Sequence, residues 1–132
     1  MINQILILSQ REAVERIPHL GDVSVISIVD DGDENPKWSE NVKAHFDLRF
    51  DDTENSLNED SAKVGDFKGL KNFIDTLPTS ILIIHCFAGI SRSAGVAAAI
   101  SEYIGLRMKI WTNKRYEPNV LVYELVKSAL QN

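Results

Sequence analysis

The chain has 132 residues, of which 44% are hydrophobic and 25% are charged. This length and composition suit a single domain, spanning residues 1–132, that buries a hydrophobic core. The formal net charge of −5 argues against a nucleic-acid or anionic-membrane binder, because such proteins usually present a basic surface.

Cysteine usage and the N-terminal residues indicate the compartment. The chain has one cysteine, so it can form no internal disulfide, which fits a reducing compartment. No apolar stretch approaches the roughly 20 residues that span a membrane, and the first residues lack the basic region of a secretory signal. We therefore expect a cytoplasmic protein, without a membrane segment, that is a monomer.

The first part of the chain predicts a strand, a helix and a second strand. Ile5–Leu8 has the apolar character of a strand. Ser9, with Glu12 three positions later, forms the pattern of a capping box and predicts a helix over Gln10–Ile17. Val23–Val29 is rich in β-branched residues and predicts a central strand.

The middle of the chain predicts a strand, a long loop and a helix. A turn-rich segment, residues 30–36, precedes the alternating pattern of Ala44–Phe50, which predicts a strand. Asp51–Val64 is polar and predicts a loop that reaches toward the active face. Apolar residues at helical spacing predict a helix over Asp66–Leu77, which Pro78 ends.

The last third predicts a strand followed by two helices. Ser80–His85 is expected to be a strand, and Ser91–Ile104 and Val120–Leu130 are expected to be helices, the second capped by Asn119. Strands that alternate with helices predict an α/β fold with a mostly parallel central sheet flanked by helices. Ligands of such sheets bind at the carboxyl ends of the strands.

The most informative segment is residues 85–93, His-Cys-Phe-Ala-Gly-Ile-Ser-Arg-Ser. A lone cysteine at a strand end is commonly a small buried hydrophobe. Here, however, Gly89 and Arg92 follow Cys86 on a turn between a strand and a helix, an arrangement that brings a thiol and a guanidinium to one bound oxyanion. His85 precedes the cysteine and would point to the opposite side of the strand, so we expect it to support the loop by hydrogen bonding.

The loop has the groups that a phosphate needs. Backbone N–H groups that turn inward form an anion-binding concavity, and the helix that follows adds its positive end. An arginine can hold two phosphate oxygens in a fork, and the thiolate, the nucleophilic form of cysteine, is favoured in such surroundings. The residues expected to bind phosphate are Phe87, Ala88, Gly89, Ile90, Ser91 and Arg92.

The same segment resembles the signature loop of the cysteine-dependent protein tyrosine phosphatases, and residues 88–93 are most similar to the dual-specificity branch. The resemblance implies a protein tyrosine phosphatase-like fold of the dual-specificity type. It also implies that Cys86 is the nucleophile, that Arg92 holds the phosphate and that the hydroxyl of Ser93 eases departure of the thiolate. This chemistry needs no metal and no cofactor.

The reaction also needs a carboxyl group that first protonates the leaving group and then activates water. The candidates are the acidic residues of the predicted loop: Asp51, Asp52, Glu54, Glu59 and Asp60. The resemblance implies an acid on a loop well upstream of the cysteine, and Asp52-Thr53 is similar to the Asp-Thr context of some dual-specificity enzymes. Asp52 is the favoured general acid, and Asp51 remains the alternative.

These residues together predict a protein phosphatase that hydrolyses phosphomonoesters through a cysteinyl-phosphate. The uncharged residues 87–90 favour a monoester over a phosphoinositide, and the partner would be a phosphorylated protein or peptide. The short chain suggests a shallow pocket that accepts phosphotyrosine and also phosphoserine or phosphothreonine. Two alternatives stay open: a phosphoprotein-binding module without turnover, and a rhodanese-like sulfur transferase.

Overall fold

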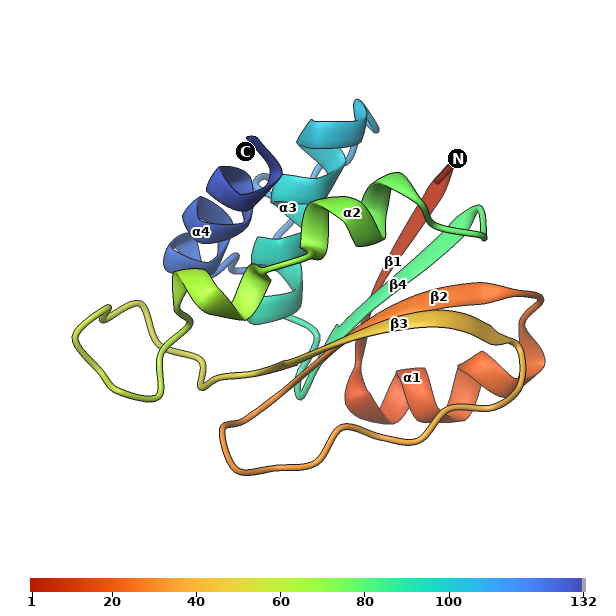
Figure 1. The fold of residues 1–132 in the computed structure, drawn as a ribbon, viewed down its shortest axis with the longest axis horizontal. Helices are drawn as coiled ribbons and strands as arrows, with labels where there is room; N and C mark the ends of the chain where they lie inside the picture. The colour runs from red at the N-terminus through yellow and green to blue at the C-terminus, as the bar shows by residue number, and fades with distance from the viewer. Residues whose placement is uncertain (132) are drawn as a thin grey trace.

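A sheet of four parallel strands forms the centre of the computed structural model, which describes residues 1–131 (Figure 1). The strands lie in the order β1-β4-β2-β3, and they are β1 (Gln4–Ser9), β2 (Val23–Val29), β3 (Val42–Arg49) and β4 (Ile81–Cys86). Every residue of β2 is buried, as its β-branched sequence predicts for an interior strand, whereas exposed residues alternate along β3 at the sheet edge. The observed strands match the predicted ones, with ends that differ by two residues or fewer.

Helices cover both faces of this sheet (Figure 1). One face carries α1 (Gln10–Arg16), and the other carries α2 (Leu70–Asp75), α3 (Arg92–Ile104) and α4 (Val120–Gln131). The predicted capping box of α1 is present, because Ser9 Oγ accepts from the Glu12 N–H at 3.0 Å and Glu12 Oε1 accepts from the Ser9 N–H at 3.0 Å. The predicted α/β architecture with a parallel sheet is confirmed.

Alternation along β4 divides its side chains between two apolar cores. Leu82, Ile84 and Cys86 belong to the larger core, beneath α3 and α4, whereas Ile83 belongs to the smaller core, beneath α1. His85 therefore lies on the α1 side of the sheet, opposite Cys86, as its place in the strand predicts. No helix within residues 1–131 is long and apolar enough to cross a membrane.

The predicted helix over Asp66–Leu77 is wrong, because the structure divides this segment in two. A 3₁₀ helix covers Val64–Phe67, and α2 then begins at Leu70. Gly69 lies between them with φ of 87°, in the left-handed region that an α-helix cannot contain. The apolar spacing predicted the buried face correctly, but the backbone at Gly69 interrupts the helix.

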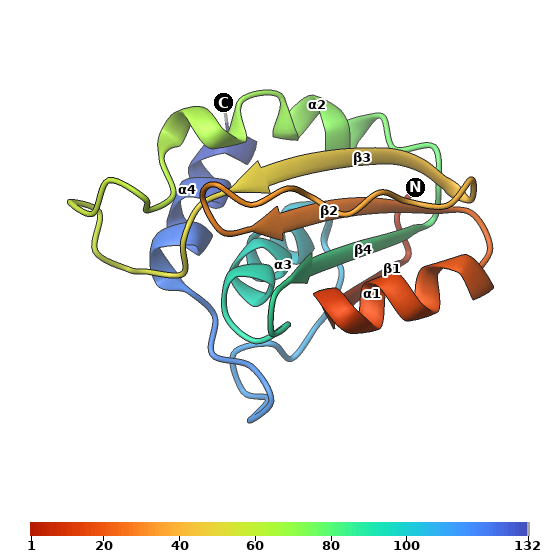
Figure 2. The same cartoon turned by 90° about the horizontal axis from the view of Figure 1, so that it is seen from below.

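The carboxyl ends of the strands meet at one edge of the sheet, where Figure 2 shows the arrowheads of β2, β3 and β4. Ser27 of β2 pairs with His85 of β4, and Val29 of β2 pairs with Arg49 of β3. The segments that follow β2, β3 and β4 therefore begin side by side. The candidate site forms among these three segments.

Candidate active site

Residues 86–92 are called the Cys86 loop. This loop runs from Cys86, the last residue of β4, to Arg92, the first residue of α3. Cys86 is 2% exposed. Sγ lies 3.1 Å from Ser93 Oγ, and it accepts a hydrogen bond from the Gly89 N–H at 3.3 Å. Two hydrogen-bonding groups thus surround the sulfur, an arrangement that can stabilise a thiolate.

Gly89 makes the tight turn of this loop possible. Its φ is +72°, and a Cβ at this position would lie 2.6 Å from Leu8 C and from Ser9 N of β1. A side chain here would be strained by the backbone conformation and by contact with the neighbouring strand. The Gln10 N–H, at the start of α1 directly after β1, also donates to Phe87 O of the loop at 3.1 Å.

Arg92 is buried at the end of the Cys86 loop, with 5% of its surface exposed. Its Nη1 donates to Asp30 Oδ1 at 2.7 Å and to Phe50 O at 2.9 Å. Its Nε has no partner within the described part of the chain, although it is buried. One side of the guanidinium is therefore anchored by the segments after β2 and β3, while Nε is a buried donor without a hydrogen-bond partner among the described residues.

Asp52 comes from the Asp52 loop, defined as residues 50–54, which follows β3. Its Oδ1 accepts two hydrogen bonds of 2.9 Å, from Ser91 Oγ and from Asn119 Nδ2. The neighbouring Asp51 instead accepts from the Asp31 N–H at 3.1 Å. Of the two predicted candidates for the acid, the structure brings Asp52 to the Cys86 loop.

A cavity of about 340 Å³ opens between the Cys86 loop and the Asp52 loop. It is lined by Cys86, Asp52 and Glu117 together with residues of the loop, Phe87, Ala88, Ile90, Ser91 and Arg92. Phe87 and Ile90 are exposed apolar side chains at its rim. The cavity can thus hold a small anion between a thiol, a guanidinium and a carboxyl group.

His85 lies beneath this site in a buried hydrogen-bonded chain. Its Nδ1 is 3.3 Å from Cys86 O, and its Nε2 is 2.6 Å from Ser27 Oγ, which also accepts from Asn35 Nδ2 at 3.0 Å. Burial lowers the pKa of His85 to about 4, so the ring is neutral near pH 7. Because a carbonyl can only accept, Nδ1 carries the proton, and the Ser27 hydroxyl donates to Nε2. His85 therefore donates to the carbonyl of Cys86, the first residue of the Cys86 loop.

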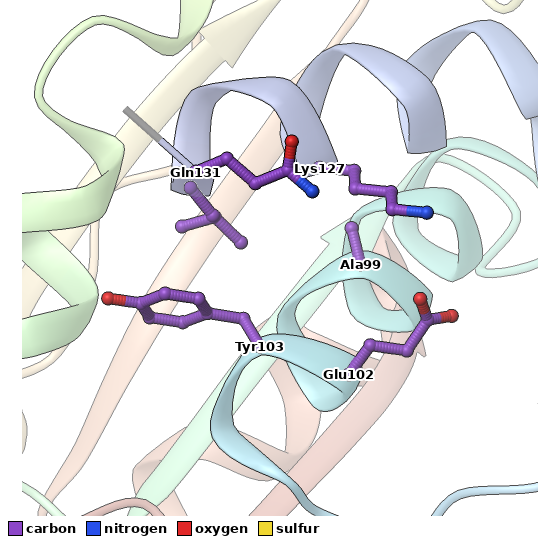
Figure 3. A pocket seen from close by; sticks show the side chains of 6 residues that line it. Ala99, Glu102, Tyr103, Lys127 and Gln131 are labelled. Atoms are coloured by element: carbon purple, nitrogen blue, oxygen red, sulfur yellow. The ribbon is translucent and has the colours of Figure 1, made fainter.

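Four other cavities among residues 1–131 have no lining residue in the Cys86 loop. Figure 3 shows one of about 200 Å³ between α3 and α4, where Ala99, Glu102 and Tyr103 face Lys127 and Gln131. It shares no lining residue with the Cys86 cavity. Within residues 1–131, no group of three His, Cys, Asp or Glu side chains is placed to hold a metal ion.

Sequence reasoning missed several residues at this site. It did not foresee that Asp30 would hold Arg92, that Glu117 would line the cavity, or that the Ser91 side chain would contact Asp52. It predicted Asn119 as a helix cap, which is confirmed by a 3.0 Å hydrogen bond from the Val122 N–H to Asn119 Oδ1, but not its contact with Asp52. The one available signal was that Asp30 directly follows a buried strand.

The sheet order, the helices on both faces and the cysteine loop after β4 define an α/β fold of the dual-specificity phosphatase-like class. The chain is similar to the crystal structure of human tyrosine phosphatase-like serine/threonine/tyrosine-interacting protein, with a TM-score of 0.65 and 20% sequence identity. The similarity covers 94% of this chain and 89% of that one. No family model and no curated protein matches the sequence. At this identity, the likeness shows the fold alone.

Proposed function

We propose that the protein is a phosphatase that hydrolyses phosphomonoesters on proteins or peptides through a cysteinyl-phosphate. The observation that carries this proposal is that Cys86, Arg92 and Asp52 line the same cavity. Cys86 sits at the end of a parallel strand before a 13-residue helix, where the helix N-terminus attracts an anion. The unpaired Nε of Arg92 is the buried donor that a phosphate oxygen would satisfy.

The first step transfers the phosphoryl group to sulfur. The Cys86 thiolate attacks phosphorus, a P–S bond forms, and the bond from phosphorus to the leaving oxygen breaks. Asp52, as the carboxylic acid, gives its proton to that oxygen. Because its Oδ1 receives two hydrogen bonds, Oδ2 is the oxygen suited to carry the proton.

The second step returns the enzyme to its starting state. Asp52, now a carboxylate, takes a proton from water as the water oxygen attacks phosphorus, and the P–S bond breaks. The departing thiolate accepts a hydrogen bond from Ser93, which lies 3.1 Å from Sγ. Inorganic phosphate leaves, and Cys86 and Asp52 have regained their original protonation states.

The charges of the cavity support a monoester as the substrate. Arg92 is the one cationic residue among those that line it, alongside the carboxyl side chains of Asp52 and Glu117. A phosphoinositide with several phosphates would meet carboxylates rather than further cations there. We expect phosphotyrosine and phosphothreonine peptides to be hydrolysed, and activity confined to phosphotyrosine would contradict the shallow pocket that we infer.

The experiment compares hydrolysis of 4-nitrophenyl phosphate and phenyl phosphate by the wild type and by Cys86→Ser, Asp52→Asn and Asp51→Asn. Cys86→Ser should show no turnover while still binding vanadate in a calorimetric titration. Asp52→Asn should lose about 10²-fold or more on phenyl phosphate, within the range of general acid catalysis, and Asp51→Asn should retain most activity. A larger loss in Asp51→Asn would identify Asp51 as the acid.

Two other results would overturn the proposal. Wild-type protein that binds phosphopeptides but turns over no phosphate ester would be a binding module, a role that the word "interacting" in the name of the similar human protein also suggests. Sulfur transfer from thiosulfate to cyanide without phosphate hydrolysis would instead indicate a sulfur transferase.

A further inference from the structure

We propose that Asn119, at the start of α4, is a positioning residue that holds Asp52 in place for proton transfer. This inference rests on the proposed phosphatase function. It concerns a residue outside both the Cys86 loop and the Asp52 loop, 67 positions from Asp52 in the sequence.

Three consecutive residues of the Asp52 loop contact the start of α4. Asn119 Nδ2 donates to Asp52 Oδ1 at 2.9 Å and to Thr53 O at 3.1 Å. The Val120 N–H donates to Glu54 Oε2 at 2.8 Å. The helix start therefore holds both the side chain of the candidate acid and the backbone that carries it.

Asn119 is itself held in a single orientation. It is 2% exposed, and its Oδ1 accepts from the Val122 N–H at 3.0 Å. This bond identifies the opposite end of the amide, Nδ2, as the donor toward the Asp52 loop. The Asn119 N–H also donates to Ser91 O at 3.0 Å. Asn119 therefore connects the Cys86 loop with the Asp52 loop.

This connection has a chemical consequence for Asp52. Ser91 and Asn119 both donate to Oδ1. A proton on that oxygen would be repelled by the hydrogens of the two donors. The pair of donors therefore directs the proton to Oδ2. Without the Asn119 donor, Oδ1 would keep the hydrogen bond from Ser91 alone, and the carboxyl group would be less well oriented. Proton delivery to the leaving oxygen would then be slower, even though Cys86 and Arg92 remain in place.

A purely structural role for Asn119, as the cap of α4, can be separated from positioning by choice of variant. Serine is as good an N-cap as asparagine, but its short side chain cannot span the distance to Asp52. Asn119→Ser thus keeps the cap and removes the donor, whereas Asn119→Ala removes both. Asn113→Asp is the control, because this exposed asparagine caps a turn through Oδ1 and lies outside the site.

The measurement is kcat/KM for 4-nitrophenyl phosphate and phenyl phosphate. Nitrophenolate leaves without much help, whereas phenol, whose pKa resembles the value of about 10 for tyrosine, needs the acid. We expect both Asn119→Ser and Asn119→Ala to lose about 10- to 100-fold on phenyl phosphate, part of the 10²–10⁴-fold effect of a general acid. Each should lose less than about threefold on 4-nitrophenyl phosphate, where the acid contributes little.

Asn119→Ala should have a lower melting temperature than Asn119→Ser, because it loses the cap as well as the bonds to Asp52 and Thr53, and Asn113→Asp should match the wild type with both substrates. An equal loss on the two substrates in Asn119→Ser, or no loss on either, would overturn the positioning role while leaving the phosphatase function standing. A wild type that hydrolyses neither ester would overturn both. The two failures are therefore distinguishable.

Discussion

His85 lies buried beneath the candidate site and contacts it through hydrogen bonds. Its neutral ring accepts a hydrogen bond from the Ser27 hydroxyl and donates one to the carbonyl of Cys86. Trp38 packs edge-on against the same ring, with centroids 5.4 Å apart. Ser27, Cys86 and Trp38 thus fix the orientation of the His85 ring. His85 in turn stabilises the end of β4, where the Cys86 loop begins.

This environment predicts a pH dependence of stability. Burial lowers the pKa of His85 to about 4 in the folded chain, whereas an unfolded chain has an ordinary value near 6.5. Between these values the unfolded chain binds a proton that the folded chain does not, so the free energy of unfolding decreases as the pH falls from about 6.5 to 4. Between a pH above 6.5 and a pH below 4, the shifted pKa of His85 changes the free energy of unfolding by roughly 3 kcal/mol.

Urea unfolding of the wild type and of His85→Asn at several pH values between 4 and 7.5 measures this contribution. His85→Asn should be less stable at pH 7.5, but it should lose less stability on acidification than the wild type does. Other acid-sensitive groups act equally in both proteins, so the comparison isolates His85. Parallel curves would show that His85 is not buried as a neutral ring.

Among the elements, α3 and α4 approach each other closely at Gly95. A Cβ on Gly95 would lie 2.7 Å from Asn119 O and 3.4 Å from Tyr123 N. The small residue lets the first turn of α4 reach the Cys86 loop, where the Asn119 N–H donates to Ser91 O. Packing between two helices thereby determines where Asn119 lies.

Gly95→Ala should therefore be destabilising, although alanine ordinarily stabilises a helix interior by about 1 kcal/mol relative to glycine. We expect the variant to lose about 1–3 kcal/mol, as overpacked positions do, and to hydrolyse phenyl phosphate more slowly. Gly65→Ala is the control, because a Cβ added there would have no atom within 4 Å, and its stability should change by less than about 0.5 kcal/mol. Urea unfolding and initial rates test both, and a Gly95→Ala protein more stable than the wild type would contradict the close packing.

At the scale of the whole molecule, negative charge gathers on the loops that follow β2 and β3. The carboxylates there form no ion pair with a lysine or arginine of residues 1–131, apart from Asp30 with Arg92. A hydrogen bond with Asp31 and the nearby charge of Asp51 raise the pKa of Asp60 above its ordinary value. These loops carry Asp52 and adjoin the cavity, so the substrate that we propose would approach an acidic surface.

We therefore predict that the charge around the phosphorylated residue affects the rate. Phosphopeptides with lysine or arginine beside that residue should have a kcat/KM about tenfold higher than matched peptides with aspartate or glutamate, through electrostatic steering. The ratio should decrease as salt increases from about 0.01 to 1 M, because ions screen exposed charges. Phenyl phosphate, which has no charged group besides its phosphate, serves as the reference. Equal rates for the two peptide sets at low salt would refute the prediction.

The sequence alone determined the features whose signals lie within a few neighbouring residues. The strand before Cys86, the helix after it and the capping box at Ser9 and Glu12 all appear as predicted. Cys86, Gly89 and Arg92 lie within one turn, so the short segment already places them together. Gly69 was a visible signal as well, but apolar spacing alone could not show that its backbone would interrupt the helix.

Only the tertiary structure decided which distant residues complete the site. Asp30 lies 62 positions from Arg92, and Asp52 lies 39 positions from Ser91 and 67 from Asn119. These pairs meet because the strands adopt the order β1-β4-β2-β3 and because Gly95 lets α4 approach α3. Strand order and helix packing result from burial of apolar faces over the whole chain, and no local pattern encodes them. The thiol and the guanidinium were therefore evident in the sequence, whereas the partners of Arg92 and Asp52 emerged only from the fold.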